Sequence, residues 1–338
     1  MATADADVEV TLTQDRHDSL EDAVAVAERA EELGFERVGF GEVTGWDSVA
    51  LLTLLAERTE TIGLATDVVN PYARSPAQLA QAAASVQSLS DGRLRLGLGA
   101  SSPALVEGWH GLEFDRPLRR LREAIEVFEQ ATSGEEVTYD GEVFTPDGMR
   151  LDGPPPCDVP IDVAALSPKG VELAGRFADG WVPQLFTPDG LRGRLEDLHR
   201  GAELGSRDPA ELRTSLLLRA CAMEDGDRAR QLGRQHVAFM ISLYGPFYRQ
   251  SVAAQGHEEM VEEIRSTWMD GDREGAVAAV DDEVLDGLVA CGTPEQVNSV
   301  IDEFAAIDGC DAVRVGWLMR ADDDVVRSTM EAVAPGNR

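Results

Sequence analysis

Residues 61–99 read TIGLATDVVNPYARSPAQLAQAAASVQSLSDGRLRLGLG, and their pattern decides the fold. The apolar run Thr61–Val69 predicts a strand, Pro76–Leu89 predicts an amphipathic helix, and Leu94–Gly99 predicts a second strand. Strands that alternate with helices in this way are typical of β-α-β units, in which the strands lie parallel. This stretch therefore predicts one repeating unit of a parallel α/β fold.

The same alternation continues on both sides of this unit. Further strands are expected at Val8–Leu12, Val38–Gly41, Ile161–Ala164, around Trp181-Val182, at Leu212–Ala222 and at Val313–Trp317. Helices are expected from the cap residue Ser19 to Leu33, and at Asp47–Arg58, Pro117–Thr132, Lys169–Phe177 and Asp323–Ala332. Eight strands are enough to close a (β/α)8 TIM barrel, and a doubly wound open sheet is the alternative fold.

Two segments interrupt the alternation, and we interpret both as insertions in a single domain that spans residues 1–338. Near residues 135–153, the turn Asp140-Gly141 separates Val137–Tyr139 from Val143–Thr145, which predicts a small hairpin. Residues 227–292 are mostly helical in pattern and contain no clear strand, so they predict a helical insertion.

The net charge of -32 is extreme, and Lys169 is the one lysine in a chain that otherwise uses arginine. Strong negative charge disperses a protein by self-repulsion, and concentrated salt screens that repulsion to within about 3 Å at 1 M. The composition therefore favours the cytoplasm of a salt-loving cell, and an acidic protein of a mesophile with a GC-rich, arginine-biased genome is the alternative. Nucleic acid and anionic membranes are excluded as partners, because both require cationic contacts.

The four cysteines are scattered, without a CxxC motif or a histidine spacing suited to zinc, so no metal site is expected. They are typical of reduced thiols in a cytoplasmic protein. The N-terminus lacks a signal-peptide pattern, and no stretch approaches the length of a membrane span.

In parallel barrels the active site is built by the loops that follow the C-terminal ends of the strands. Glu42 follows the second predicted strand and is our candidate catalytic acid or hydrogen-bonding group, because a carboxylate in a semi-enclosed mouth can have a raised pKa. Trp46 and Trp109 lie in such loops and either stack on a bound ring or pack at the edge of the core. Arg74 and Arg93 are expected to pair with barrel carboxylates.

Two of these loops are suited to binding an anion. Gly97 and Gly99, with Ala100-Ser101 after them, would let backbone N–H groups approach a phosphate closely. Ser167 and Lys169 open a predicted helix, where free N–H groups and the helix dipole favour negative charge. A compact ammonium at Lys169 would add to that site.

Three motifs together carry a resemblance to a known family. They are Val69-Asn70-Pro71-Tyr72-Ala73-Arg74-Ser75-Pro76, Ser90-Asp91-Gly92-Arg93-Leu94-Arg95-Leu96-Gly97-Leu98-Gly99 and Ala178-Asp179-Gly180-Trp181. In this order they resemble the luciferase-like monooxygenase superfamily, and within it the oxidoreductases that depend on the deazaflavin coenzyme F420. The nearest resemblance is to the methylenetetrahydromethanopterin reductases, and it covers roughly Leu33 to Pro183.

The resemblance implies a bulge in the third strand with a cis peptide bond between Asp67 and Val68, which supports the deazaflavin ring from behind. The ring would lie near Glu42, Thr66 and Asn70. The coenzyme phosphate would lie near Ala100-Ser101 and Leu166-Ser167.

The implied chemistry is hydride transfer between C5 of the coenzyme and a small organic substrate, with a one-carbon pterin or folate as the candidate, in a homodimer. Where some relatives have an Asp-His pair, this chain has Glu42-Val43, so a histidine base is missing at that place. The anionic tail of F420 would need arginines such as Arg74 along its path, or molar salt that screens the repulsion.

Other functions stay open at this point. An FMN-dependent monooxygenase has the same fold, and a barrel that isomerises a phosphate ligand or binds a cofactor without catalysis belongs to another class. The substrate is undetermined, because the aromatic cluster at Tyr244–Tyr248 is suited either to a substrate pocket or to an oligomer interface.

Overall fold

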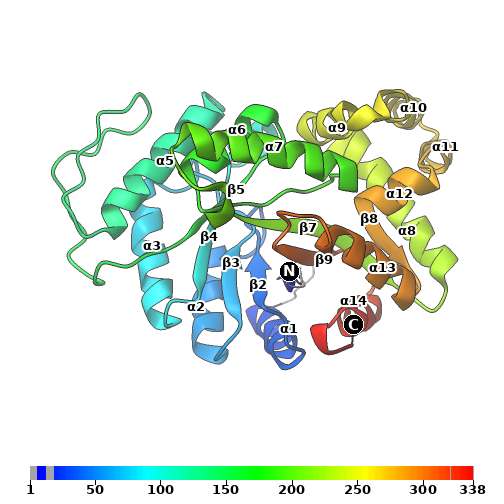
Figure 1. Cartoon of the computed structure of the whole chain (residues 1–338), viewed down its shortest axis with the longest axis horizontal. Helices are drawn as coiled ribbons and strands as arrows, with labels where there is room; N and C mark the ends of the chain where they lie inside the picture. Colours follow the sequence, from blue (N-terminus) through cyan, green and yellow to red (C-terminus); the bar gives the residue numbers. More distant parts are fainter. Residues whose placement is uncertain (1–5, 13–18, 320, 338) are drawn as a thin grey trace.

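The computed structural model describes residues 6–12, 19–319 and 321–337 (Figure 1). Eight parallel strands close into a barrel, because β1 pairs with β9 and β6 pairs with β7. The strands are β1 (Asp7–Leu12), β2 (Arg37–Phe40), β3 (Gly63–Thr66), β4 (Leu94–Gly99), β5 (Ile161–Ala164), β6 (Gly180–Trp181), β7 (Arg213–Ala222) and β9 (Ala312–Trp317). The (β/α)8 TIM barrel predicted from the sequence is confirmed, and the open-sheet alternative is wrong.

Helices surround the barrel, and most begin at a side-chain cap as the sequence predicts. Ser19 accepts a hydrogen bond from the N–H of Asp22 at the start of α1, and Ser75 caps α3 in the same way. The surrounding helices are α1 (Leu20–Glu32), α2 (Ser48–Arg58), α3 (Pro76–Leu89), α5 (Pro117–Thr132), α6 (Pro168–Phe177), α7 (Pro188–Leu204), α13 (Pro294–Ala305) and α14 (Asp323–Ala332). A short helix, α4 (Pro103–Gly108), follows β4.

A second apolar cluster lies beside the barrel and is built mainly by the segment between β7 and β9, at the right of Figure 1. Its helices are α8 (Gly226–Phe239), the π-helical turn η3 (Met240–Tyr244), α9 (Pro246–Val252), a second π-helical turn η4 (Ala253–His257), α10 (Glu258–Met269), α11 (Arg273–Ala278) and α12 (Asp282–Leu288). The predicted helical insertion is therefore largely helical. None of the helices in the described part of the chain is long and apolar enough to cross a membrane.

The prediction that residues 227–292 contain no strand is wrong at their end. Val289–Gly292 forms β8, which pairs in parallel with the C-terminal half of β7, with Cys291 opposite Cys221. All four residues of β8 are buried. A short apolar run that directly follows a helix cannot be told from the helix by periodicity alone, and only the pairing with β7 decides it.

The predicted hairpin near residues 135–153 is present only as a loosely paired loop. Val137 forms an isolated antiparallel bridge with Met149, and Tyr139 N–H donates to the Pro146 carbonyl. The predicted strand Val143–Thr145 does not form, because the N–H groups of residues 142–144 donate to the buried carboxylate of Glu123 in α5. A carboxylate that accepts three backbone N–H groups replaces the ladder that a strand would need.

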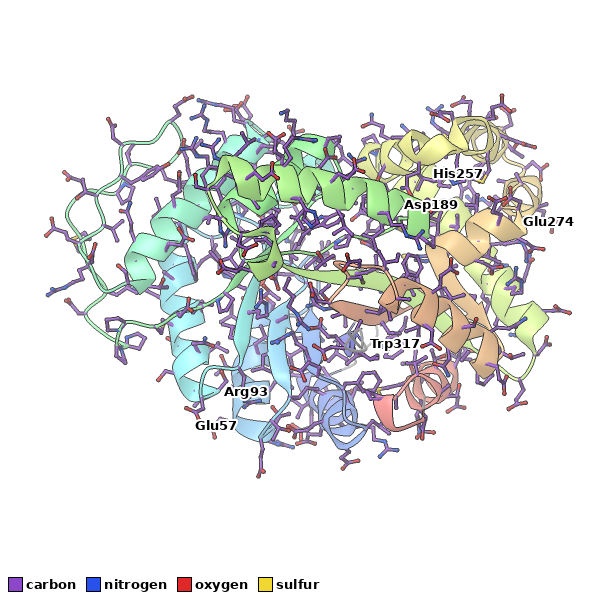
Figure 2. The ribbon with its side chains drawn as sticks, in the orientation of Figure 1. Glu57, Arg93, Asp189, His257, Glu274 and Trp317 are labelled. Carbon is purple, nitrogen blue, oxygen red and sulfur yellow. The ribbon has the colours of Figure 1, made fainter. Side chains whose placement is uncertain are left out.

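The barrel strands alternate between apolar side chains that face the helices and charged or small side chains that face the interior. In β1, for example, Val8 and Val10 belong to the main apolar core, whereas Glu9 between them lies within ion-pair distance of Arg37 from β2. Charged side chains on the surrounding helices are exposed instead: Figure 2 shows Glu57, Asp189 and Glu274 at the surface, on α2, α7 and α11. The interior charges therefore need partners that the surface charges do not.

Candidate active site at the C-terminal end of the barrel

The chain bulges immediately after β3, and the peptide bond between Asp67 and Val68 is cis, as the resemblance implies. The Val68 side chain packs against β4, where Gly97 and Gly99 face it. A Cβ atom at Gly99 would lie 2.6 Å from Cγ2 of Val68, and one at Gly97 would lie 2.1 Å from the Thr66 carbonyl oxygen. The two glycines are therefore required because the bulge occupies the space of their missing side chains.

This packing corrects our interpretation of Gly97 and Gly99 as phosphate-binding amides. The N–H of Gly97 donates to Thr66 Oγ1 at 2.7 Å, and the N–H of Gly99 donates to the Val69 carbonyl at 2.9 Å. Thr66 in turn donates to the Gly97 carbonyl at 2.8 Å and is buried. These groups connect β3 to β4 and have no N–H left for a phosphate.

Arg314 from β9 connects this bulge to β1. Its guanidinium forms ion pairs with Asp67 and, at 2.7 Å, with Glu9, and all three side chains are at most 3% exposed. Desolvation by burial raises the pKa of Glu9, but the charges of Arg314, Arg37 and Arg213 outweigh it and hold the pKa far below its ordinary value. Burial also raises the pKa of Asp67, although Arg314 opposes the shift.

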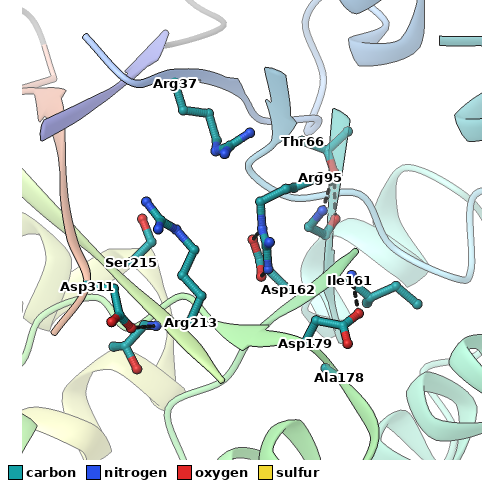
Figure 3. Close-up of polar contacts among 12 residues, drawn as sticks. Arg37, Thr66, Arg95, Ile161, Asp162, Ala178, Asp179, Arg213, Ser215 and Asp311 are labelled. Atoms are coloured by element: carbon teal, nitrogen blue, oxygen red, sulfur yellow. Dashed lines mark hydrogen bonds and ion pairs between the residues drawn. The ribbon is translucent and has the colours of Figure 1, made fainter. Parts of the chain in front are cut away.

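The rest of the barrel interior continues this charge network (Figure 3). Arg95 from β4 donates to both carboxylate oxygens of Asp162 from β5, at 2.9 and 2.5 Å. Arg213 from β7 donates to Glu9 at 2.9 Å, and Ser215 donates to Glu9 at 2.6 Å. This network was not predicted from the sequence. Its signal is a single charged residue between two apolar ones, which occurs in Val8-Glu9-Val10, Leu94-Arg95-Leu96, Ile161-Asp162-Val163 and Val313-Arg314-Val315.

Glu42 follows β2 and is held by three hydrogen-bond donors. Arg74 Nη1 lies 2.5 Å from Glu42 Oε1, while Oε2 accepts hydrogen bonds from the N–H and the hydroxyl of Ser48, at 3.1 and 2.9 Å. Arg74 also pairs with Asp47, which caps α2. The expected pairing of Arg74 with a carboxylate is confirmed. Because two carboxylates surround Arg74, it is not available to line the path of an anionic coenzyme tail.

Among the described residues Arg93 pairs with no carboxylate, which corrects that expectation. Its guanidinium donates to the backbone carbonyls of Ala56, Thr59 and Ile62 at 2.8 to 2.9 Å. It thus satisfies the end of α2, where carbonyl groups lack partners within the helix.

The segment between β4 and α5 holds two buried polar atoms that have no hydrogen-bond partner among the described residues, one on each side of α4. One is Oγ of Ser101, whose backbone adopts a left-handed conformation with a φ of 62° directly after Ala100, and the other is Nε2 of His110. Unpaired buried polar atoms are uncommon in proteins, and a bound group is one explanation for them. Ser101 lies where the resemblance implies the coenzyme phosphate, and His110 follows the short helix α4 that comes after Ser101.

Lys169 lies at the exposed start of α6. Its ammonium contacts both oxygens of Glu172, at 3.0 and 3.2 Å, and the side chain is 76% exposed. Ser167 accepts a hydrogen bond from the N–H of Gly170 at 3.2 Å and caps the helix, and Leu166 is half-buried before it. This geometry favours a surface ion pair for Lys169 over a phosphate contact.

Asn70 is buried and organises the loop after the bulge. Its Oδ1 accepts hydrogen bonds from the N–H groups of Tyr72 and Ala73, at 3.0 and 2.9 Å, so its amide nitrogen is the group that can donate to a bound ring. Trp46 and Trp109 are 39% and 63% exposed. Neither indole is therefore buried in the core, and both are accessible at the surface.

The fold is a parallel eight-stranded α/β barrel. Its distinctive side chains lie after the C-terminal ends of β2, β3 and β4, which is the end where such barrels have their active sites. Residues 1–308 match the family model of luciferase-like monooxygenases, and the chain belongs to this family. Within the described residues, no cluster of three or more His, Cys, Asp or Glu side chains could hold a metal ion.

The sequence is similar to that of named proteins over most of its length. The sequence is 32% identical to 5,10-methylenetetrahydromethanopterin reductase of Archaeoglobus fulgidus, over 76% of this chain and 77% of that protein. It is 31% identical to a putative coenzyme F420-dependent oxidoreductase of Mycobacterium tuberculosis, over 79% of this chain and 83% of that protein. The coenzyme F420-dependent tetrahydromethanopterin reductase of Methanopyrus kandleri has the same fold, with a TM-score of 0.84, 23% identity and 98% of each chain covered.

Proposed function

We propose that this protein is a coenzyme F420-dependent oxidoreductase that transfers a hydride between the deazaflavin and a small organic substrate. The observation that carries the proposal is the unpartnered buried hydroxyl of Ser101, in the loop where the resemblance implies the coenzyme phosphate, with the unpartnered His110 Nε2 after the short helix that follows. The names of the relatives in Archaeoglobus fulgidus and Mycobacterium tuberculosis support the same reading.

The residues present fit this coenzyme. Ala100-Ser101, with Leu166-Ser167 at the start of α6, would hold the phosphate, because a left-handed turn and a helix start both direct N–H groups outward. The bulge at Asp67–Val68 and the amide of Asn70 would support the ring, with Thr66 behind them in β3. Bound F420 supplies the carbon that gives or accepts the hydride, C5 of its deazaflavin ring.

The protein contributes position and fixed polar groups. Oε2 of Glu42 already accepts two hydrogen bonds from Ser48, whereas Oε1 accepts one, from Arg74. A carboxylate oxygen has two lone pairs, so Oε1 can accept one more hydrogen bond from an O–H or N–H group of the substrate. Glu42 therefore orients the substrate, and Trp46 and Trp109 exclude water from the ring at the mouth of the barrel.

We further propose that the substrate is a one-carbon pterin or folate. The Archaeoglobus fulgidus relative is named a methylenetetrahydromethanopterin reductase, which supports this substrate class. The test is the oxidation of reduced F420 with methylene-tetrahydromethanopterin or methylene-tetrahydrofolate, with acetone as the comparison substrate.

The working environment is a separate proposal. We propose a homodimer, which the resemblance implies, in the cytoplasm of a salt-loving, haloarchaeal cell, an environment that the net charge of -32 supports. Arg74 is neutralised by Glu42 and Asp47, so it does not offset the negative charge of the coenzyme tail. We propose that molar salt screens the repulsion between this acidic surface and the tail instead. Sedimentation and thermal unfolding across a potassium chloride series test both parts.

The coenzyme is tested by titrating the purified protein in molar salt with F420 and with FMN, following the absorption and fluorescence of each. We expect saturable binding of F420, weaker binding of FMN, and at least tenfold weaker F420 binding in Ser101→Ala. The exposed serine Ser266 provides the control Ser266→Ala. Binding of FMN alone, or of neither chromophore, would contradict the proposal.

A further inference from the structure

A second group of buried polar side chains lies in the helices between β7 and β8, and the proposed hydride transfer uses none of it. His236, in the last turn of α8, is 5% exposed, and neither ring nitrogen has a hydrogen-bond partner among the described residues. The hydroxyls of Ser242 in η3 and Ser251 in α9 are also buried without a partner there. Leaving such a group unpaired is unfavourable, so three in one segment require an explanation.

The three side chains belong to helices that pack on one another. The chain passes from α8 into η3 without a break, and α9 packs against η3, where the rings of Tyr244 and Tyr248 are 5.1 Å apart. Ser251 is three residues after Tyr248 and so lies on the same face of α9. Two π-helical turns, η3 and η4, flank α9. Such turns are rare in proteins, and those that occur are often found at functional sites.

This group lies at the same end of the barrel as the coenzyme loops, but on the opposite side. Arg219 lowers the pKa of His236 and acts on Tyr248, so its guanidinium is near both. Arg219 Nη1 donates to the carbonyl of Trp317, the last residue of β9. Gln255 in η4 bonds to Leu185 and Thr187 in the loop after β6. The group is therefore placed beside the C-terminal ends of β6, β7 and β9.

The protonation states decide which ligand fits. Burial lowers the pKa of His236 to about 3, so the imidazole is neutral, with one nitrogen that donates and one that accepts a hydrogen bond. Burial also raises the pKa of Tyr248, which keeps its phenol protonated. An anion would leave the accepting nitrogen of His236 unpaired, and a cation would leave the donating one unpaired. An amide or a hydroxyl, which both donates and accepts, pairs with both kinds of group.

We propose that His236, Ser242 and Ser251 form a subsite for an uncharged amide or hydroxyl group of the substrate. This proposal rests on the proposed function in one respect: it takes the bound molecule to be the substrate that reacts at the same end of the barrel. The subsite would hold the end of the substrate remote from the reacting carbon, across the mouth from the loops that follow β2 to β5. His236 is then a binding residue that sets substrate specificity.

The ring nitrogens of His236 report on this subsite directly. Full-length protein labelled with 15N-histidine would be titrated in molar salt, without F420, with four small probes: acetamide, 2-propanol, acetate and methylammonium. The signals of His236 are assigned by their loss in His236→Gln. We expect acetamide and 2-propanol to shift them in a saturable manner, with no shift for the exposed His199 of α7. A response to acetate or methylammonium instead, or to no probe, overturns the proposal.

A second variant separates the subsite from general packing. In Ser251→Ala we expect acetamide to bind His236 at least fivefold more weakly, whereas the exposed Ser266→Ala leaves binding unchanged. Equal binding in both variants would remove Ser251 from the subsite. Because F420 is absent from these titrations, the subsite can fail while F420 binding holds, or hold while F420 binding fails, so the two proposals are judged separately.

Discussion

Arg314 lies between Glu9 and Asp67 inside the barrel and forms ion pairs with both, so that one guanidinium from β9 connects β1 to the bulge after β3. All three side chains are almost completely buried. Removing one partner of a buried pair leaves an uncompensated charge, which is far more costly than the net value of the intact pair. The geometry of the bulge therefore depends on a residue far away in the sequence.

The first prediction concerns this cation. Arg314→Met leaves Glu9 and Asp67 facing each other in the barrel, and we expect it to lower the free energy of unfolding by about 3–5 kcal/mol. Denaturant unfolding in molar salt measures the change. The control is Arg327→Met, at an arginine that is 65% exposed, which should change stability by less than about 0.5 kcal/mol. Equal effects of the two variants would contradict the role of Arg314.

The second prediction concerns pH. The pKa of His236 is about 3 in the folded protein, whereas its ordinary value is 6.5, so the unfolded chain binds more protons between these two values. The contribution of His236 is fully present above pH 6.5 and is lost at about 1.4 kcal/mol per pH unit as the pH falls toward 3. We expect His236→Gln to remove this slope from the unfolding free energy, and His199→Gln to retain it. A slope that is the same in wild type and His236→Gln would show that another group causes it.

The third prediction concerns the two glycines of β4. A Cβ at Gly99 would lie 2.6 Å from Val68, so Gly99→Ala should destabilise the fold by about 1–3 kcal/mol and weaken F420 binding at least tenfold by displacing the bulge. At Gly108 in α4 a Cβ would meet nothing within 4 Å, so Gly108→Ala is the matched control. Thermal unfolding and an F420 titration measure both effects. If Gly99→Ala is destabilised but still binds F420 tightly, the bulge does not contribute to coenzyme binding.

The fourth prediction concerns Lys169. Its exposed ion pair with Glu172 is worth about 0–1 kcal/mol at most, so Lys169→Ala should leave the F420 dissociation constant within about twofold. The comparison is Ser101→Ala, in which the constant should rise at least tenfold. A loss of binding in Lys169→Ala that diminishes with added salt would return this lysine to the phosphate site.

The fifth prediction concerns Glu42. Glu42→Gln keeps the shape of the side chain but breaks the pair with Arg74, and we expect kcat to fall at least tenfold while F420 affinity stays within threefold. The exposed Glu57 of α2 supplies the control Glu57→Gln (Figure 2). Steady-state kinetics and the F420 titration distinguish the two quantities. An unchanged kcat would exclude Glu42 from the reaction.

Much of the fold follows from the local pattern. Pro76–Leu89, Leu94–Gly99 and Ile161–Ala164 have the predicted bounds to the residue, because each combines a clear period with a clear end. The bounds of β8 could not be predicted, since four apolar residues after a helix carry no period of their own. The predicted strand Val143–Thr145 failed for a different reason, because Glu123, from another element, takes its N–H groups.

The sequence by itself determined the barrel, its order of elements and the loops at its C-terminal end, because hydrophobic period and helix caps are local properties. Only the tertiary structure decided what the residues in those loops contact. Gly97 and Gly99 pack on the bulge instead of binding phosphate, Arg93 caps α2 instead of pairing with a carboxylate, and Lys169 faces Glu172. The reason is physical: a hydrogen bond or an ion pair is made with whichever group the closed barrel brings within about 3 Å, and that partner is often far away in the chain.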